Sequence, residues 1–474
     1  MTAQPITAAA PLLLALATFV AVLFVDAFGS RKATLVTAVA GLALSAAAAV
    51  PSATQPTSFV AAVATAGGTT SVVSAVVLTL TALAIVGGWP RLSATPGSGR
   101  VVVLLAGGAA SAVLAVAAKD LLLVVIALET LALTGYALIS SAGTPRSDTA
   151  ATTYFVQGAL AAGLLLFGTA GVVVVSGSTL MPGLAQPFRE PGSAAVTSLV
   201  LLFAAFLFKA GGFPLHSWVP DAYETAEPAS AAYLASVPKT AALVVLGTLM
   251  LGSDVATRLV PVAALVAAAS VVFGTVAGLR QTSYRRMLGY SAIAQTGFAL
   301  TALVAGASAL PAVTLMALVY AIATFGAFMT AEALGACDGW DGTIRDMAGT
   351  GSARPVLSTA LTVCLLSLTG IPLTAGFWGK FISFSAATSA GYTWLAAVGV
   401  VGSVISFGYY GAVLRAVWLD GPSDAEAESR APDDAARATS LSATVVVALA
   451  SVTLLVIGVA PLFFGSAFFA FLGR

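Results

Sequence analysis

Residues 201–218 read LLFAAFLFKAGGFPLHSW, an apolar run followed by Lys209 and then by a Gly-Gly-x-Pro sequence. A lysine inside a membrane span is energetically costly. Gly211 and Gly212 weaken a helix, and Pro214 removes a backbone donor. Backbone that is broken at membrane depth is tolerated only where it is buried in protein or lines a cavity. The stretch therefore predicts a discontinuous transmembrane helix, with a simple proline kink as the alternative.

The composition of the whole chain fits a membrane protein. The 474 residues are 59% hydrophobic and 8% charged, and the mean hydropathy is +1.01, whereas soluble domains carry about 25% charged residues. Apolar runs of about twenty residues, the length that crosses a bilayer, recur from end to end. This pattern predicts an all-α polytopic membrane protein surrounded by the lipid bilayer. The net charge of +1 argues against a nucleic-acid partner.

The N-terminus and the cysteines carry two further expectations. The first 25 residues are apolar but lack a basic region and a clear cleavage site, so we expect a retained first span rather than a cleaved signal peptide. Cys337 and Cys364 do not have the spacing of metal ligands. We therefore expect neither a metal site nor a disulfide framework.

Apolar runs and polar breaks divide the chain into fourteen expected transmembrane helices. The only loop with a soluble composition is 419–439. The approximate limits of the spans are 7–26, 34–50, 70–89, 101–118, 120–141, 152–176, 195–224, 228–251, 256–279, 286–306, 309–335, 354–387, 394–419 and 441–466.

The basic residues orient these spans. If the N-terminus faces outward, thirteen Lys and Arg residues fall in inward loops and four on the outward side, which is a strong positive-inside bias. An even number of spans then places both termini on the outer side. The inward residues are Arg31, Lys32, Arg91, Arg100, Arg146, Arg280, Arg285, Arg286, Arg345, Arg354, Arg415, Arg430 and Arg437. The outward residues are Lys119, Arg189, Arg258 and Arg474.

A second broken segment, SLTGIPLTAGFWGKF, lies at 367–381. The helix-break residues Gly212 and Pro214 of the seventh span correspond to Gly370 and Pro372 of the twelfth, in a shared G-[FI]-P-L pattern. Because the two spans are five apart, they cross the membrane in opposite directions. Paired interruptions of this kind indicate two inverted five-helix repeats, spans 4–8 and 9–13. The expected units are a three-helix segment (1–100), a first repeat (101–251), a second repeat (252–420), and a loop with the last helix (421–474).

Four ionisable residues are singled out because they fall well inside spans: Glu129, Lys209, Lys239 and Lys380. Such residues normally face the protein interior or water and mark an ion or proton path. Buried ion pairs are the structural alternative, but one acid can pair with only one of the three lysines. For Lys380, which follows a break, a side chain reaching the membrane interface is a further alternative.

These residue types suit proton transfer. Burial disfavours the charged form of a lysine, and a nearby carboxylate restores it. Movement of Glu129 relative to a lysine would therefore change the proton affinity of that lysine, and the row predicts a switchable proton relay. A sodium site would call for clustered oxygen ligands, which backbone carbonyls and hydroxyls are still able to supply.

Other polar residues are secondary candidates. His216 is the only histidine, and a structural role is favoured over a relay role. Gln295, Tyr320 and Ser291 could hydrogen-bond water on an interior path. The run PDAYETAEP at 220–228 suggests a solvated helix connection, with a proton uptake funnel as the alternative; its acids are Asp221, Glu224 and Glu227.

Four stretches together resemble the antiporter-like subunits of respiratory complex I, the proton-pumping NADH:quinone oxidoreductase: FKAGGFPLHSWVPDAYETAEP, SVPKTAALVVL, RRMLGYSAIAQTGF and LTGIPLTAGFWGKF. The resemblance covers roughly 100–420. It implies fourteen helices with two inverted repeats and broken seventh and twelfth helices. Lys380, where subunit M carries glutamate, and an end soon after the last span make the chain most similar to subunit N.

By this resemblance, Glu129 and Lys209 are the pair of the fifth and seventh helices. Lys239 is then the relay lysine of the eighth helix, and Lys380 is the terminal lysine of the twelfth. The family often carries histidine where this sequence has Gln295. Since glutamine cannot hold a proton, a relay at this position would need water.

The resemblance also implies a setting. The chain would be a proton-translocating subunit in a bacterial inner (plasma) membrane, driven by quinone reduction elsewhere and without a redox centre of its own. NADH, flavin, iron–sulfur clusters and quinone would belong to the complex. The neighbouring partners would be the antiporter-like subunit M and the small membrane subunits on the way to the quinone site.

Two other function classes remain open at the level of sequence. The same lysine row would serve a subunit of a multisubunit cation/proton antiporter. A stand-alone solute carrier would need polar groups beside the breaks, where only Lys209 and His216 are found.

Overall fold

The computed structural model describes residues 4–52, 57–58, 65–66, 68–95, 97–181, 192–251, 256–335, 342–421 and 434–464. Arg189, Cys337, Arg430, Arg474 and most of the 419–439 loop lie outside these ranges, as do the side chains of Arg258 and Arg437. The described chain is almost entirely helical. Its one strand pair joins β1 (Thr57–Ser58) to β2 (Thr65–Ala66) in antiparallel register.

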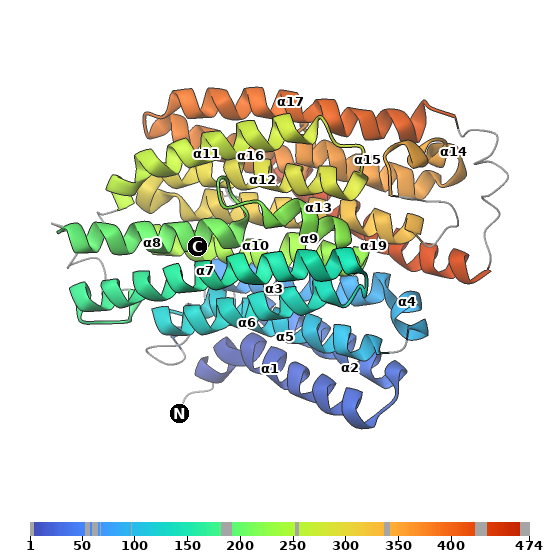
Figure 1. Ribbon diagram of the computed structural model, residues 1–474, viewed down its shortest axis with the longest axis horizontal. Helices are drawn as coiled ribbons and strands as arrows, with labels where there is room; N and C mark the ends of the chain where they lie inside the picture. The colour runs from blue at the N-terminus through green and yellow to red at the C-terminus, as the bar shows by residue number, and fades with distance from the viewer. Residues whose placement is uncertain are drawn as a thin grey trace.

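The long helices run side by side in roughly one direction, and the short helices α4 and α14 lie at one end of the bundle (Figure 1). The first half holds α1 (Gln4–Phe28), α2 (Arg31–Ser52), α3 (Gly68–Gly87), α4 (Trp89–Ala94), α5 (Ser98–Ala117), α6 (Leu121–Ser140), α7 (Pro145–Ser176), α8 (Ser193–Ala210), α9 (Trp218–Thr225) and α10 (Pro228–Leu251). The second half holds α11 (Ala256–Gly278), α12 (Tyr284–Ala302), η2 (Leu303–Ser308), α13 (Leu310–Gly335), η3 (Arg345–Met347), α14 (Thr350–Ala353), α15 (Pro355–Thr369), α16 (Ala375–Ser389), α17 (Thr393–Trp418) and α19 (Asp434–Phe464).

These helices confirm the predicted all-α polytopic fold. Thirteen of the described helices are long and apolar enough to cross a membrane. The pair α15 and α16, each too short for that test, is compatible with a fourteenth, interrupted crossing. The expected spans agree with the observed helices to within several residues. The short helices α4, α9 and α14 were not predicted as separate elements.

Side-chain caps define where several of the helices begin. The Asp120 carboxylate accepts hydrogen bonds from the backbone N–H groups of Leu122 and Leu123 at the start of α6. At the start of α7, Thr144 and Ser147 form a reciprocal capping box. Such caps satisfy N–H groups that the helix itself leaves free, and this need is strongest where water is scarce.

Both predicted breaks are present and are built in the same way. The helix α8 ends at Gly211 (φ 68°) and α15 ends at Gly370 (φ 93°), both left-handed. In each case the N–H of the next residue, Gly212 or Ile371, donates to the carbonyl of the residue five positions before it, which is a Schellman motif. The predicted pairing of Gly212 with Gly370 is therefore wrong by one residue, because Gly211 is the structural equivalent of Gly370.

The helices α10, α12 and α13 form the centre of the bundle (Figure 1) and are almost entirely buried within the protein. Helices such as α7, α11 and α17 expose large apolar side chains, as lipid-facing helices do. A charged side chain on α10 therefore cannot reach lipid or bulk water. Its partners have to come from the surrounding helices.

Candidate functional site

Glu129 and Lys209 form an ion pair between α6 and the last turn of α8. The distance from Lys209 Nζ to Glu129 Oε1 is 2.9 Å. Lys209 also donates to the Leu128 carbonyl at 3.5 Å. The Lys209 side chain is 8% exposed and that of Glu129 is 26% exposed. A cation in the last turn of α8 is also favoured by the helix dipole. Because α8 ends at the break, the charge of Lys209 is stabilised both by the Glu129 carboxylate and by this dipole.

Lys239 lies at the centre of α10 and is 1% exposed. Its Nζ donates to the Ala292 carbonyl of α12 at 3.0 Å and lies 5.3 Å from the ring centroid of Tyr320 on α13. Within the described part of the chain, no carboxylate forms an ion pair with it. A Cβ on Gly211 would lie 3.6 Å from Lys239 Nζ. The left-handed glycine that ends α8 therefore brings that end of the helix against the second lysine.

Two consecutive residues of α12 bind the ends of both broken helices. Thr296 Oγ1 lies 2.7 Å from the Ala210 carbonyl of α8 and 3.0 Å from the Ala292 carbonyl that also accepts from Lys239. Gln295 Nε2 donates to the Leu368 carbonyl of α15 at 2.8 Å. The helix α12 therefore connects the two interruptions.

Tyr410 of α17 extends this connection, and sequence reasoning missed it. Its hydroxyl forms a short hydrogen bond with Ser291 and lies 3.5 Å from Gln295 Nε2. The predicted accessory residues Ser291 and Gln295 therefore meet at one hydroxyl. Nothing in the sequence distinguishes Tyr410 from its neighbour Tyr409, because only the packing of α17 on α12 selects it.

Lys380 of α16 points back into the second break. Its Nζ donates to the Thr369 carbonyl at 2.9 Å and to Ser403 Oγ at 3.1 Å, and it lies 4.1 Å from the Phe298 ring centroid. The residue is 4% exposed, so the alternative of a side chain reaching the interface is wrong. A cavity of about 450 Å³ with mostly apolar walls lies beside it.

Together these contacts make one row of polar groups through the bundle. It begins at Glu129 and Lys209, passes the end of α8 to Lys239 of α10, continues along α12, and ends at Lys380. Only the first lysine of the row has a carboxylate partner within the described ranges. Such a row offers protonatable nitrogens separated by groups that hydrogen-bond water.

His216 lies outside this row. Its ring is 4.4 Å from the Phe273 ring and 5.3 Å from the Phe213 ring, centroid to centroid. This aromatic packing favours the structural role. The part of the chain that the structure describes contains no group of three His, Cys, Asp or Glu residues able to hold a metal ion.

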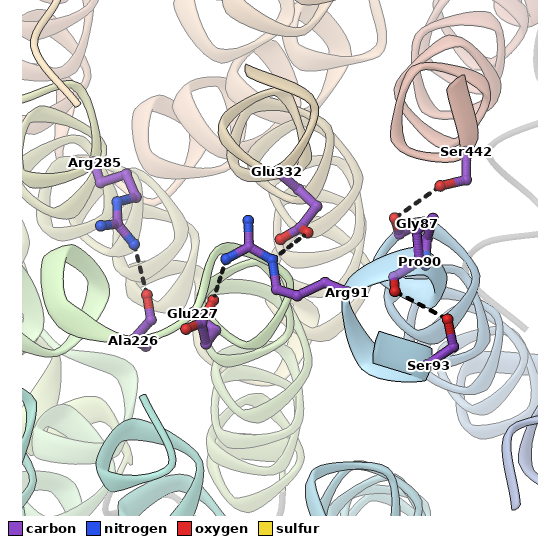
Figure 2. Close-up of polar contacts among 9 residues, drawn as sticks. All are labelled: Gly87, Pro90, Arg91, Ser93, Ala226, Glu227, Arg285, Glu332 and Ser442. Carbon is purple, nitrogen blue, oxygen red and sulfur yellow. Dashed lines mark hydrogen bonds and ion pairs between the residues drawn. The ribbon is translucent and has the colours of Figure 1, made fainter. Parts of the chain in front are cut away.

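A second cluster of charges was not predicted. Arg91 of α4 lies between two acids, with its Nη1 2.7 Å from Glu227 Oε2 and its Nε 2.9 Å from Glu332 Oε1 (Figure 2). The side chain of Glu332, on α13, is 0% exposed. The sequence interpretation that Glu129 is the one acid within the spans is therefore wrong. Glu332 lies three residues from the end of α13 and within the expected span 309–335, but it was not singled out from the sequence.

Arg91 remains charged in this setting. Burial lowers the pKa of its guanidinium, but Glu332 and Glu227 together raise that pKa by more, so that it lies above its ordinary value. Arg286 similarly binds Asp221 at 2.5 Å and Glu224 at 3.0 Å. The acids of 220–228 are therefore ion-paired and not simply solvated.

The fold defines the class of this protein, a polytopic helical membrane protein with two interrupted helices. Residues 118–406 match the family model described as NADH:quinone oxidoreductase/Mrp antiporter, TM. Because this match covers more than half of the chain, the chain belongs to that family.

Sequence relatives agree with this assignment. The chain is 37% identical over 318 residues to NADH-quinone oxidoreductase subunit N of Rhizorhabdus wittichii, covering 65% of this chain and 66% of that protein. It is 33% identical over 361 residues to the subunit N of Heliobacterium modesticaldum, covering 74% of each. The match with the first of these relatives thus spans slightly less than two thirds of its length.

Solved structures agree as well. Respiratory complex I from Thermus thermophilus with bound aureothin contains a chain with a TM-score of 0.82 and 28% identity, covering 96% of this chain and 98% of that one. The Mrp complex from Dietzia sp. contains a chain with a TM-score of 0.86 and 20% identity, covering 100% of this chain and 97% of that one. The latter likeness shows the fold alone.

Proposed function

We propose that this chain is a proton-translocating membrane subunit of a bacterial NADH:quinone oxidoreductase, of the subunit N type. The observation that supports this most strongly is the set of three buried lysines. Glu129 pairs with Lys209, and Lys239 and Lys380 each donate to a backbone carbonyl in the interior. Buried ionisable groups in spans typically mark proton paths.

In the proposed mechanism, the Glu129–Lys209 pair is the switch. While the 2.9 Å contact is closed, the carboxylate stabilises the charged form of Lys209. When the pair opens, Lys209 loses that stabilisation and its proton is repelled toward Lys239. The proton then passes along water held by Ser291, Gln295 and Tyr410, and it leaves outward from Lys380.

The driving force lies outside the chain. Quinone reduction in other subunits would bias the Glu129–Lys209 pair between its two states, and NADH, flavin, iron–sulfur clusters and quinone would be held there. The proposed partners are the antiporter-like subunit M and the small membrane subunits on the quinone side. The proposed location is the bacterial inner membrane with both termini outside, and the proposed units are 1–100, 101–251, 252–420 and 421–474.

A subunit of a multisubunit cation/proton antiporter is the second candidate function. The matching family model supports this candidate, because its description names the Mrp antiporter beside NADH:quinone oxidoreductase. Purification of the chain from its own membranes separates the two functions. Flavin and iron–sulfur subunits that co-purify support the complex I function, whereas a complex without redox subunits supports the antiporter.

Glu129→Gln is the direct test of the switch. Glutamine keeps the size of the side chain but removes the charge that stabilises charged Lys209, so we expect proton pumping to be abolished while the complex still assembles. Pumping is measured in inside-out vesicles as NADH-driven acidification, and assembly on native gels. Asp148→Asn is the matched control, since Asp148 accepts a hydrogen bond from Ser140 in the exposed first turn of α7. Normal pumping in Glu129→Gln would refute the switch.

Tyr410→Phe tests the connection along α12. The change removes one hydroxyl and leaves Ser291 without its partner, which costs about 1–3 kcal/mol where the group is buried. We expect pumping to slow while Lys239 and Lys380 remain in place. Thr388→Val is the control, because its hydroxyl bonds only the Phe384 carbonyl at an exposed position. Equal pumping in the two variants would remove Tyr410 from the path.

A further inference from the structure

Polar residues recur at every third position along and just before α10. They are Glu227, Ser230, Tyr233, Ser236 and Lys239. On a helix of 3.6 residues per turn, each three-residue step shifts by about 60°, so this strip winds about two thirds of the way around the helix while twelve residues rise about 18 Å. This strip therefore leads from the Arg91 cluster to the central lysine.

The facing helix α13 carries a second strip at every fourth position. Its members are Tyr320, Thr324, Phe328 and Glu332. Four-residue spacing keeps side chains on one face of a helix. This strip also begins at the Arg91 cluster, through Glu332, and ends at Lys239, since the Tyr320 ring lies 5.3 Å from Lys239 Nζ.

Buried polar atoms that make no hydrogen bond to another helix mark the strip on α13. Within the described residues, these atoms are Glu332 Oε2, Thr324 Oγ1 and Tyr320 Oη. Most buried polar atoms in proteins are hydrogen-bonded, and water supplies the bond where protein does not. Three such atoms along α13, which packs against α10, make a lane in which water can bind.

At the inward end of the lane lies a pocket of about 270 Å³ that contains several charged side chains. Arg91, Glu227, Ser230 and Glu332 line it, together with Ser98 and Arg100. Figure 2 shows Arg91 between its two acids, with Arg285 bound to the Ala226 carbonyl nearby. The buried Glu332 oxygen that lacks a partner belongs to the wall of this pocket.

One apolar step interrupts the lane. Phe328 packs edge-on against Tyr223, with ring centroids 5.6 Å apart. The Tyr223 hydroxyl donates to the Leu234 carbonyl at 3.3 Å. This carbonyl receives no helical hydrogen bond, because the residue four positions later is Pro238, which has no backbone N–H. Phe328 and Tyr223 are thus fixed between the pocket and Lys239, where an unbroken water file would let protons leak.

We propose that protons enter from the inward side along this lane and that Glu332 is the loading site. A proton from pocket water forms an O–H bond at Glu332, and Arg91 keeps its pairing with Glu227. That O–H bond then breaks as the proton passes over water, beyond Phe328, and forms an N–H bond on the Lys239 amine. The inference rests on the proposed proton-pumping function and adds a route by which Lys239 is supplied.

Glu332→Gln tests the loading site in the assembled complex. Glutamine still accepts a hydrogen bond from Arg91 but cannot carry the proton, and we expect pumping in inside-out vesicles to slow by about 100-fold, as for a lost acid–base group. Glu332→Asp should restore most of the rate. Glu224→Gln is the matched control, because Glu224 also pairs with an arginine, Arg286, but lies outside the lane. Normal pumping in Glu332→Gln would overturn the proposal, and so would equal loss of pumping in Glu332→Gln and Glu224→Gln.

A second experiment measures the access of an aqueous ion to the lane and does not depend on pumping. A negative result for the lane is therefore distinct from a negative result for the lysine relay. Ser236→Cys is made in the intact complex carrying Cys337→Ser and Cys364→Ala, and the reaction with Ag⁺ is followed from each side of the membrane. We expect fast reaction from the inward side only. Val245→Cys, equally buried on α10 but beyond Lys239, should react slowly. Equal rates at the two positions, or reaction from the outward side alone, would refute the lane even if Lys239 proves essential.

Discussion

Lys239→Met is expected to abolish proton pumping while leaving the complex assembled. The buried amine lies close to Gly211 at the end of α8 and donates a hydrogen bond to the Ala292 carbonyl of α12. Its loss should slow proton transfer by at least about 100-fold. Methionine fills a similar volume. Because Lys239 has no acidic partner within the described residues, its replacement leaves no buried carboxylate without a counter-charge.

The measurement compares NADH-driven acidification of inside-out vesicles with the amount of complex on native gels. Lys119→Met serves as the control, because Lys119 lies in the short connection between α5 and α6, outside the row. Wild-type pumping in Lys239→Met would show that the proton does not pass through α10.

Gly376→Ala is expected to have the largest effect on folding. A Cβ at this position would lie 1.7 Å from the Ser367 carbonyl oxygen, where α16 crosses the end of α15. That oxygen belongs to the backbone and cannot rotate away. Overpacking of this kind costs about 1–3 kcal/mol or more, and it would push Lys380 away from the Thr369 carbonyl.

Thermal unfolding of the purified chain in detergent measures this effect, together with the fraction that assembles. Gly411→Ala on α17 makes the same chemical change where nothing lies within 4 Å, and it should leave stability unchanged or raise it by about 0.5–1 kcal/mol. Equal melting temperatures for the two variants would show that the second break has room to relax.

The sequence predicted the helices and the buried lysines well because both depend on local signals. Apolar runs have the length of a bilayer, and Lys209 or Lys380 inside such a run is conspicuous. The helix breaks could be predicted for the same reason, because glycine and proline alter the backbone at the position where they occur. The register of the repeat was wrong by one residue, because only the backbone conformation shows that Gly211 ends α8.

Contacts between distant segments could not be predicted in this way. Glu332 looked like a residue at a helix end until α13 was seen to lie at the centre with Arg91 beside it. Tyr410 is one tyrosine of an adjacent pair, and the choice between them depends on how α17 rotates against α12. The relay roles of Glu129, Lys209, Lys239 and Lys380 remain predictions that the variants above test.

The hydrogen bonds of Gln295 and Thr296 bear on whether the two halves of the chain are autonomous. These neighbours belong to the second half, yet Thr296 closes the end of α8 in the first half while Gln295 closes α15. Lys239 likewise finds its carbonyl partner, Ala292, across the same boundary. A fragment that stops at 251 would therefore have a frayed end to α8 and an unpartnered amine. Co-expression of the two fragments is expected to restore what neither builds alone, and the predicted repeat would then not be a unit of folding.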